Sequence, residues 1–274
     1  MNWKERRSYW RQSIRVQAKI EAEYIPKVQR VIKDQISSFI AEARIVGWMT
    51  AYHRWNTTIV KGDLFNVIIS LYKKSGITFA NMSRRAVKSG LKYRTMGFNA
   101  EWTAAVIEYL GAQGLQLVNW MDQTTKQYLI DILSQGIIEG WGFEEVANKI
   151  SESPIADKWR ILRIVRTESM RAANYGAVLG AKSHNLLMDK VWISAHDERV
   201  RQWSHKDQYD HLQLDGNQVG MEEQFKQVSL KGVEAVADQP GDPKAPAAFT
   251  INCRCVVAFE PKRDANGRLI RIGT

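Results

Sequence analysis

The sequence predicts an α+β fold, with a mostly helical N-terminal region followed by a C-terminal domain in which a long helix packs on a small antiparallel sheet. Apolar residues recur at three- and four-residue steps through most of the first 190 residues, as in amphipathic helices. After residue 185, short apolar runs alternate with turn residues, a pattern typical of strands. The 274 residues, 45% of them apolar, are enough to bury a core.

Three helices are expected before residue 140. Residues 28–49 carry one apolar face, which predicts a helix that ends near Gly47. Two further helices are expected at about 100–119 and about 122–138. The apolar face of the first helix consists of Val28, Val31, Ile32, Ile36, Phe39, Ile40, Ala43 and Val46.

Two more helices precede the predicted strands. Residues 139–150 predict a glycine-marked turn and a short amphipathic helix, which Ser-Glu-Ser-Pro at 151–154 ends. Residues 157–184 show the strongest helical pattern of the chain. Its apolar face contains Ile161, Val165, Ala172, Gly176 and Leu179.

Three later segments predict the sheet. Residues 189–195 and 249–259 have the apolar, alternating composition of strands. Between them, Gly216 and Asn217 form a two-residue signal for a hairpin turn. Three antiparallel strands suffice for a small sheet.

The net charge of +10 is concentrated in the N-terminal half. Residues 1–150 carry 21 Lys and Arg against 13 Asp and Glu, whereas residues 151–274 carry 18 against 16. Basic patches attract phosphate backbones or acidic protein surfaces, unless they are simply solvated faces without a ligand. The candidate contact residues for DNA or a protein partner are Lys4, Arg6, Arg7, Arg11, Arg15, Lys73, Lys74, Arg84, Arg85 and Lys88.

Two tryptophans accompany the first basic patch. Trp3 and Trp10 are seven residues apart, which places them on one face of a terminal helix. Either they pack in the core, or they dock to a partner groove or stack against nucleic acid. In the second case, the terminal helix becomes ordered only on binding.

The composition also argues against membrane and secreted classes. No stretch of about 18 uninterrupted apolar residues is present, and the N-terminus lacks the apolar segment of a secretory signal. We therefore expect a protein that folds in a cytoplasm, where its two cysteines stay reduced unless a metal binds them.

Both cysteines lie in the sequence Ile-Asn-Cys-Arg-Cys. On a strand, Cys253 and Cys255 point to one face and Arg254 to the other, with the two cysteine Cα atoms about 6.5–7 Å apart, at the outer edge of disulfide geometry. Together with one or both of His211 and His205, the two thiolates suit a tetrahedral structural zinc site. Alternatively, both cysteines are small apolar side chains of the core.

The predicted long helix carries a polar set. Helical spacing makes Glu168 a neighbour of Arg171, and Arg171 a neighbour of Asn174. Together with charged residues near 197–201, these side chains form either a polar network that joins the helix to the strands or an active site. An Arg, Glu and His set also suits a ribonuclease-like or ADP-ribosyl-transferring pocket.

Six motifs in a fixed order carry a resemblance to a known family. In this order they resemble the phage Mu protein F-like family, the minor head or head-morphogenesis proteins of tailed phages, over about residues 120–258. The motifs are ILRIVRTESMRAANYGA (161–177), KVWISAHDERVR (190–201), HLQLDGNQV (211–219), Phe225, PGDP (240–243) and INCRC (251–255).

The resemblance implies a non-enzymatic protein that acts in procapsid morphogenesis beside the portal. It implies a location inside the capsid of a virion assembled in the bacterial cytoplasm, and in some relatives ejection with the DNA. The implied partners are the portal protein, scaffold or major capsid protein and packaged double-stranded DNA, without a membrane. The family motifs also single out a polar network of Arg166, Glu168, Arg171, Asn174, Asp197, Arg199, Arg201 and Asp215.

The sequence departs from the family in one place. Relatives tend to have a histidine two or three residues after the second arginine of the DERVR motif, whereas residues 202–210 separate Arg201 from His211 here. His211 keeps the His-x-x-Leu-Asp-Gly spacing, and His205 is the competing candidate for the family histidine.

The predicted domains are a basic helical region at 1–120, a Mu F-like α+β domain at 121–262 and a tail at 263–274. Two other functions stay open beside the head protein. One is a capsid-carried effector enzyme, either a nuclease or ADP-ribosyltransferase-like, and the other is a generic basic DNA-binding protein.

Overall fold

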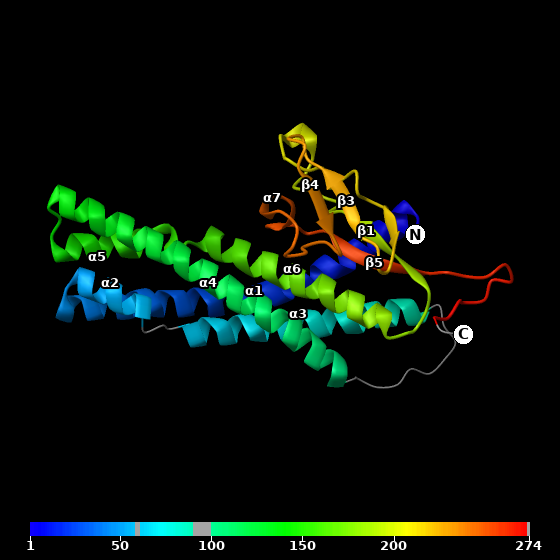
Figure 1. Ribbon diagram of the computed structural model, residues 1–274, viewed down its shortest axis with the longest axis horizontal. Coiled ribbons are helices and arrows are strands. Elements are labelled where there is room, and N and C mark those ends of the chain that lie inside the picture. The colour runs from blue at the N-terminus through cyan, green and yellow to red at the C-terminus, as the bar shows by residue number, and fades with distance from the viewer. Residues whose placement is uncertain (58–60, 90–99, 273–274) are drawn as a thin grey trace. The chain divides into compact units, whose positions relative to one another are not determined.

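The computed structural model describes residues 1–57, 61–89 and 100–272 (Figure 1). The helices are α1 (Trp3–Val46), α2 (Trp48–Thr57), α3 (Lys61–Ser89), α4 (Ala100–Glu139), α5 (Phe143–Glu152), α6 (Lys158–Lys182) and α7 (Ala247–Thr250), with 3-10 turns η1 (Pro154–Ala156) and η2 (Trp203–His205). The strands are β1 (Met188–Ile193), β2 (Gln218–Gly220), β3 (Phe225–Val228), β4 (Glu234–Ala237) and β5 (Val256–Pro261). The predicted α+β class is confirmed.

The chain forms two compact units, which we describe separately. Both units are discontinuous in sequence, because α1, α3, α4 and α6 each contribute residues to both. The predicted domains at 1–120, 121–262 and 263–274 are continuous segments and stay a prediction. Unit 1 consists of Met1–Glu21, Leu71–Tyr109 and Arg166–Thr274, and unit 2 consists of Ala22–Ser70 and Leu110–Val165.

Unit 2 is built from helices. The predicted apolar face after residue 28 is confirmed, with Val28, Ile32 and Phe39 almost completely buried. The helix ends at Val46, next to the predicted Gly47. Gly47 adopts a φ of 83°, in the left-handed region that glycine enters without a steric penalty, and its N–H donates to the carbonyl of Ala43.

Two helical predictions in unit 2 have different outcomes. The short helix after the glycine-marked turn is confirmed as α5, which buries Val146 and Ile150. The division into helices at 100–119 and 122–138 is wrong, because α4 is continuous from Ala100 to Glu139. No Gly or Pro stands between the two predicted helices. The hydroxyl of Thr124 donates to the carbonyl of Trp120 inside the continuous helix.

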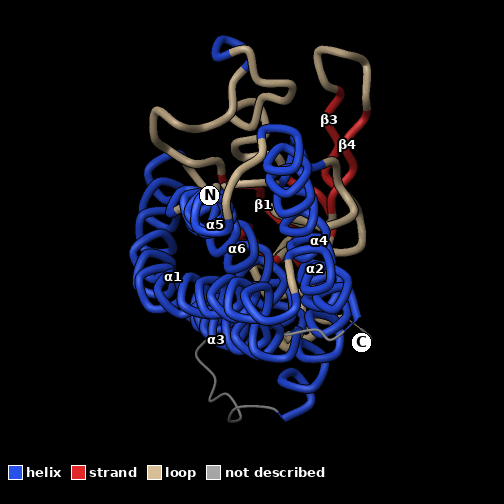
Figure 2. Tube along the Cα trace, turned by 90° about the vertical axis from the view of Figure 1, so that its left-hand side faces the viewer, coloured by secondary structure: helices blue, strands red, loops and turns tan. Residues whose placement is uncertain are grey.

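Unit 1 contains the predicted antiparallel sheet. β1 is the central strand of the order β2-β1-β5, and both of its pairings are antiparallel. Val191 of β1 lies opposite Ala258 of β5 and Gln218 of β2. β3 and β4 form a separate antiparallel ribbon that the sequence did not predict, drawn in red in Figure 2.

The predicted long helix, α6, packs on this sheet. Met170 of α6 shares a buried cluster with Val191 of β1 and Val256 of β5. α6 also approaches α3 closely, since a Cβ added at Gly176 would lie 2.0 Å from the carbonyl oxygen of Gly76. Only a glycine fits at that position of the helix.

Two strand predictions are wrong. The expected strand at 249–259 begins only at Val256, because Pro246 starts the helical turn α7 and Asn252 adopts a φ of 59°. The predicted two-residue hairpin at Gly216 and Asn217 is instead the end of a series of turns that leads into β2, and no strand lies directly before these turns. The amide of Gly216 donates to the carbonyl of Trp192, which anchors these turns to β1.

The N-terminal part of α1, which belongs to unit 1, packs on the sheet of that unit. Trp10 is buried in the same cluster as Val191 and Val256, and its indole N–H donates to the carbonyl of Arg254 at 3.0 Å. Trp3 stays half exposed, at 51%. Trp10 therefore packs in the core, which is the first of the two alternatives given for these tryptophans.

Candidate functional site

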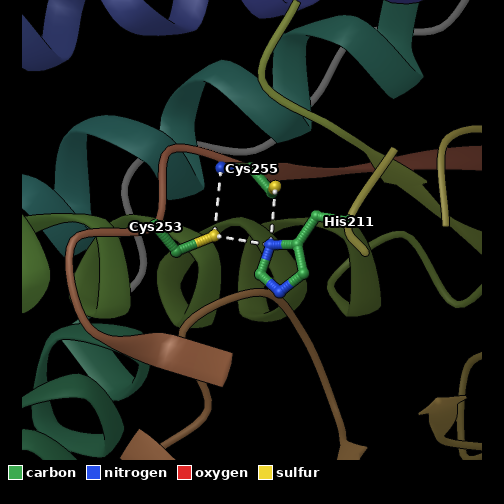
Figure 3. A group of neighbouring side chains, drawn as sticks. All are labelled: His211, Cys253 and Cys255. Atoms are coloured by element: carbon green, nitrogen blue, oxygen red, sulfur yellow. Dashed lines mark hydrogen bonds between the residues drawn. The ribbon is translucent and has the colours of Figure 1, made fainter. Parts of the chain in front are cut away.

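His211, Cys253 and Cys255 form a buried group in unit 1 (Figure 3). The Nδ1 atom of His211 lies 3.5 Å from the Sγ atom of Cys253 and 3.4 Å from the Sγ atom of Cys255. The three ligand atoms all lie within 4.8 Å of one another, and both cysteines are free. The structure thus brings together three of the four predicted metal-ligating residues.

His205 is the fourth predicted ligand, and it lies elsewhere. It is exposed in η2 and is not part of the group, the only one of this kind that the described residues contain. The two candidate histidines therefore differ in geometry: only His211 faces the cysteines.

The turn that carries His211 is fixed by the preceding residue. One carboxylate oxygen of Asp210 accepts hydrogen bonds from the amides of Leu212 and Gln213, and the other accepts one from the amide of Trp203. The amide of His211 donates to the carbonyl of Arg201. These contacts hold the His-x-x-Leu-Asp-Gly motif in a tight turn.

Aromatic rings enclose the imidazole of His211. Its ring centroid lies 5.5 Å from that of Trp192 and 4.6 Å from that of Phe249, both in edge-on contact. The Nε2 atom of His211 is buried and has no hydrogen-bond partner among the described residues. Figure 3 shows the Nδ1 atom of the imidazole pointing at the two sulfurs.

The cysteine loop, residues 251–255, is held in place because side chains of α6 form hydrogen bonds with the backbone of this loop and of the start of β5. Asn174 donates to the carbonyl of Cys255 and accepts from the amide of Val257, and the hydroxyl of Thr167 accepts from the amide of Asn252. The amide of Cys255 also donates to the sulfur of Cys253. These contacts explain how the two cysteines, although they lie outside a strand, both face the Nδ1 atom of His211.

Arg254, between the two cysteines, has its own ion-pair partner. Its guanidinium donates to a carboxylate oxygen of Asp197 at 2.6 Å, and its side chain is 7% exposed. Burial lowers the pKa of Arg254, whereas Asp197 acts in the opposite direction.

The pKa values of the two thiols are shifted in opposite directions. A hydrogen bond from Cys255 lowers the pKa of Cys253 well below its usual range, and burial raises the pKa of Cys255 well above it. The two thiols therefore titrate as a coupled pair.

Glu168 and Arg171 form the buried ion pair that helical spacing predicted. The Nη1 atom of Arg171 lies 3.0 and 2.8 Å from the two carboxylate oxygens of Glu168, and the hydroxyl of Tyr72 donates to one of them. Burial raises the pKa of Glu168, while Arg171 opposes this shift. Sequence reasoning missed Tyr72, because no local pattern links positions 96 residues apart.

The PGDP motif lies against this pair. Arg171 Nε donates to the carbonyl of Gly241, and Asn174 donates to the carbonyl of Pro240. Gly241 has a φ of 79°, and a Cβ there would lie 3.4 Å from the Cα atom of Arg171. The motif thus fits the close approach of a loop to α6.

Arg166 makes a second ion pair on α6. Its Nε and Nη2 atoms donate to the two carboxylate oxygens of Glu21 at 3.2 and 3.0 Å, and its Nη1 atom donates to Asn252. Glu21 is another partner that the sequence did not reveal, since it lies 145 residues away in α1.

The remaining members of the predicted polar network lie at two other places in unit 1. Arg201 donates to the carbonyls of Phe249 and Ile251, and the exposed Arg199 lies 3.8 Å from Asp197. Asp215 accepts from the amide of Ser194 and from Arg6 at 3.1 Å. His196 lies 3.4 Å from Asp215, and burial lowers the pKa of His196.

The predicted basic contact residues differ in their exposure and in the contacts that their side chains make. Arg6 is engaged by Asp215, and Arg7 lies over the ring of Trp3 at 5.1 Å. Arg84 is half-buried, and the side chain of Lys88 lies outside the described residues. The exposed members are Lys4, Arg11 and Arg15 in α1, and Lys73, Lys74 and Arg85 in α3.

No helix in the described part of the chain is long and apolar enough to cross a membrane.

Known proteins share this region of the chain. The family described as Phage Mu protein F like protein matches residues 127–258. Minor head protein GP7 of Bacillus phage SPP1 is 29% identical over 129 residues, which cover 46% of this chain and 38% of that protein.

Two further relatives match at similar levels. NAD(+)–arginine ADP-ribosyltransferase EFV of Enterococcus faecalis is 28% identical over 148 residues, 51% of this chain and 26% of that protein. Uncharacterized protein YqbB of Bacillus subtilis is 21% identical over 168 residues, 61% of this chain and 49% of that protein.

The matches span between about a quarter and a half of the relatives' lengths. No solved structure matches the chain significantly. The family match covers the six ordered motifs from α6 to the cysteine loop. Residues 127–258 of this chain therefore match the Phage Mu protein F-like family, as the order of its motifs predicted.

Proposed function

We propose that the protein is a non-enzymatic minor head protein of a tailed phage, which acts in head morphogenesis at the portal, inside the capsid. The observation that carries this proposal is the Mu F-like match over residues 127–258, together with the similarity to the SPP1 minor head protein. Scaffold or major capsid protein and packaged DNA are its further proposed partners.

The engagement of the motif side chains supports a structural role. Both carboxylate oxygens of Glu168 contact Arg171, and Tyr72 donates to one of them as well. Glu168 is 2% exposed, so a substrate has no access to its carboxylate without a rearrangement of the core. In this arrangement, Glu168 stabilises the fold and does not transfer protons.

The test uses phage particles that carry the protein. Mass spectrometry of mature particles and of empty procapsids should detect the protein in both, and the copy number should stay constant if it is bound at the portal. Purified portal protein should co-purify with the chain in the absence of other head proteins. The proposal would be contradicted if the protein were absent from both kinds of particle, or if a phage that lacks the gene assembled heads as wild type does.

Contact with DNA has a separate test. We expect the Arg11→Glu/Arg15→Glu variant to bind duplex DNA more weakly than wild type, because both side chains are exposed in the first basic patch. Lys226→Glu/Lys231→Glu is the matched control, with the same charge change at exposed positions elsewhere in unit 1. Equal loss in both variants, or an affinity that does not fall with salt, would contradict a DNA contact through the patch.

The similarity to the E. faecalis ADP-ribosyltransferase favours one second candidate, a capsid-carried transferase. Its test is the transfer of labelled ADP-ribose from NAD⁺ to arginine-containing acceptors. Transfer that Glu168→Gln abolishes without a lower melting temperature would support the transferase. Under our first proposal, no transfer occurs, and the same variant lowers the melting temperature.

A further inference from the structure

The distances around His211 are those of metal ligands. In a tetrahedral zinc site, with Zn–S of about 2.3 Å and Zn–N of about 2.0–2.1 Å, a nitrogen and a sulfur ligand lie about 3.6 Å apart. The Nδ1 atom of His211 lies 3.5 and 3.4 Å from the sulfurs of Cys253 and Cys255. We propose that these three residues bind one zinc ion, which joins the turn after Asp210 to the loop before β5.

A hydrogen bond alone does not account for this arrangement. A neutral imidazole Nδ1 has either one lone pair or one N–H, so it makes one good in-plane hydrogen bond. Here two sulfurs lie at nearly equal distances from that single nitrogen. A cation between the three atoms interacts with all of them at once.

Ligand chemistry and charge select zinc. Thiolate and imidazole ligands suit Zn²⁺, whereas Mg²⁺ and Ca²⁺ prefer oxygen ligands. Two thiolates balance the two charges of the ion, which makes the site neutral. A neutral site is compatible with its apolar surroundings, in which both cysteines share a buried cluster with Trp192 and Phe249.

The described chain supplies three ligands, which leaves one corner of the tetrahedron for a water molecule. When zinc is bound to Nδ1, the Nε2 atom of His211 keeps its proton. That buried atom has no partner among the described residues, so a second water is its expected acceptor.

The proposed ion acts as a cross-link. His211 is separated from Cys253 by 42 positions, which include β2, β3, β4 and α7. A bond that closes such a loop restricts the unfolded chain and fixes the loops around the small ribbon. This role differs from the proposed function in head assembly and does not depend on it.

The first test measures metal in the full-length wild-type chain, purified without chelators and then exposed to zinc. We expect about one zinc per chain, and X-ray absorption at the zinc edge with sulfur at about 2.3 Å and nitrogen at about 2.0–2.1 Å. Chelation should lower the melting temperature, and added zinc should restore it. The proposal would be overturned if the chain held well below one equivalent of zinc both after purification without chelators and after exposure to zinc. A coordination shell made of oxygen atoms alone would also overturn it.

A matched pair of histidine variants tests the site itself. His211→Gln should lose the bound zinc, whereas His205→Gln should keep it, because His205 is exposed outside the group. Cys253→Ser should behave like His211→Gln. Zinc retained by His211→Gln and Cys253→Ser shows binding elsewhere and overturns the proposal. Cysteines of the chelated wild type that resist alkylation until a reductant is added form a disulfide, which also overturns it.

Discussion

The two compact units are stabilised by different kinds of contact. In unit 1, buried polar side chains such as Arg171 and Asn174 bind the backbone of loops. In unit 2, apolar helix faces make the core, and ion pairs such as Lys27–Glu23 lie on the surface. All the polar motif residues lie in unit 1, although the family match spans both units. Loops need specific partners, whereas helices need only a periodic apolar face.

The largest expected effect breaks the buried ion pair of unit 1. Glu168→Ala should lower the free energy of unfolding by about 3–5 kcal/mol, because it leaves the buried Arg171 without its carboxylate. Glu23→Ala, in an exposed pair of unit 2, should lower it by only about 0–1 kcal/mol. Denaturant unfolding of both variants measures the difference. Equal losses would show that the two units do not differ as described.

The next effect concerns how closely helices approach. Gly176→Ala should destabilise the protein by about 1–3 kcal/mol or more, because the new Cβ would lie 2.0 Å from the carbonyl oxygen of Gly76. Gly62→Ala is the control, since a Cβ at Gly62 meets nothing within 4 Å. It should stabilise α3 by up to about 1 kcal/mol. Thermal unfolding of the two variants should therefore shift in opposite directions.

The features that the sequence predicted well are local ones. The end of α1 at Gly47, the amphipathic α5 and the helix α6 follow from apolar spacing and from residues that stop helices. The neighbours Glu168 and Arg171 follow from helical geometry alone.

The features that the sequence did not predict depend on distant partners. Tyr72, Glu21 and Trp10 complete contacts with residues 96, 145 and 244 positions away. No periodic pattern specifies such pairs. The cysteine loop shows the same limit, because α7 and the left-handed Asn252 replace the apolar strand that its composition favoured.

A smaller effect involves the docking of the first helix in unit 1. Burial lowers the pKa of His196 below 6.5, against the attraction of Asp215 and together with the repulsion of Arg6, Arg7 and Arg11. The unfolded chain then binds a proton more readily than the folded chain, so stability falls as the pH drops below about 6.5.

The variant His196→Gln should reduce this pH dependence. Its melting temperature should fall less than that of wild type between pH 7.5 and pH 5.5, measured by circular dichroism. His205→Gln, at an exposed position, should keep the wild-type slope. Parallel curves for His196→Gln and wild type would show that His196 does not carry the effect.

The smallest expected change in stability lies on the surface of unit 2. Ile137 and Ile138 are 72% and 84% exposed near the end of α4, so Ile137→Gln/Ile138→Gln should change the free energy of unfolding by only about 0.5 kcal/mol. Ile36→Gln replaces the same type of side chain at a 7% exposed position of α1. It should lower the free energy of unfolding several-fold more, because it buries a polar amide in the core. A similar loss in both variants would mean that Ile137 and Ile138 are buried in solution. Apolar contacts, and not polar ones, would then cover the part of the surface of unit 2 that carries these two side chains, which is exposed in the isolated chain.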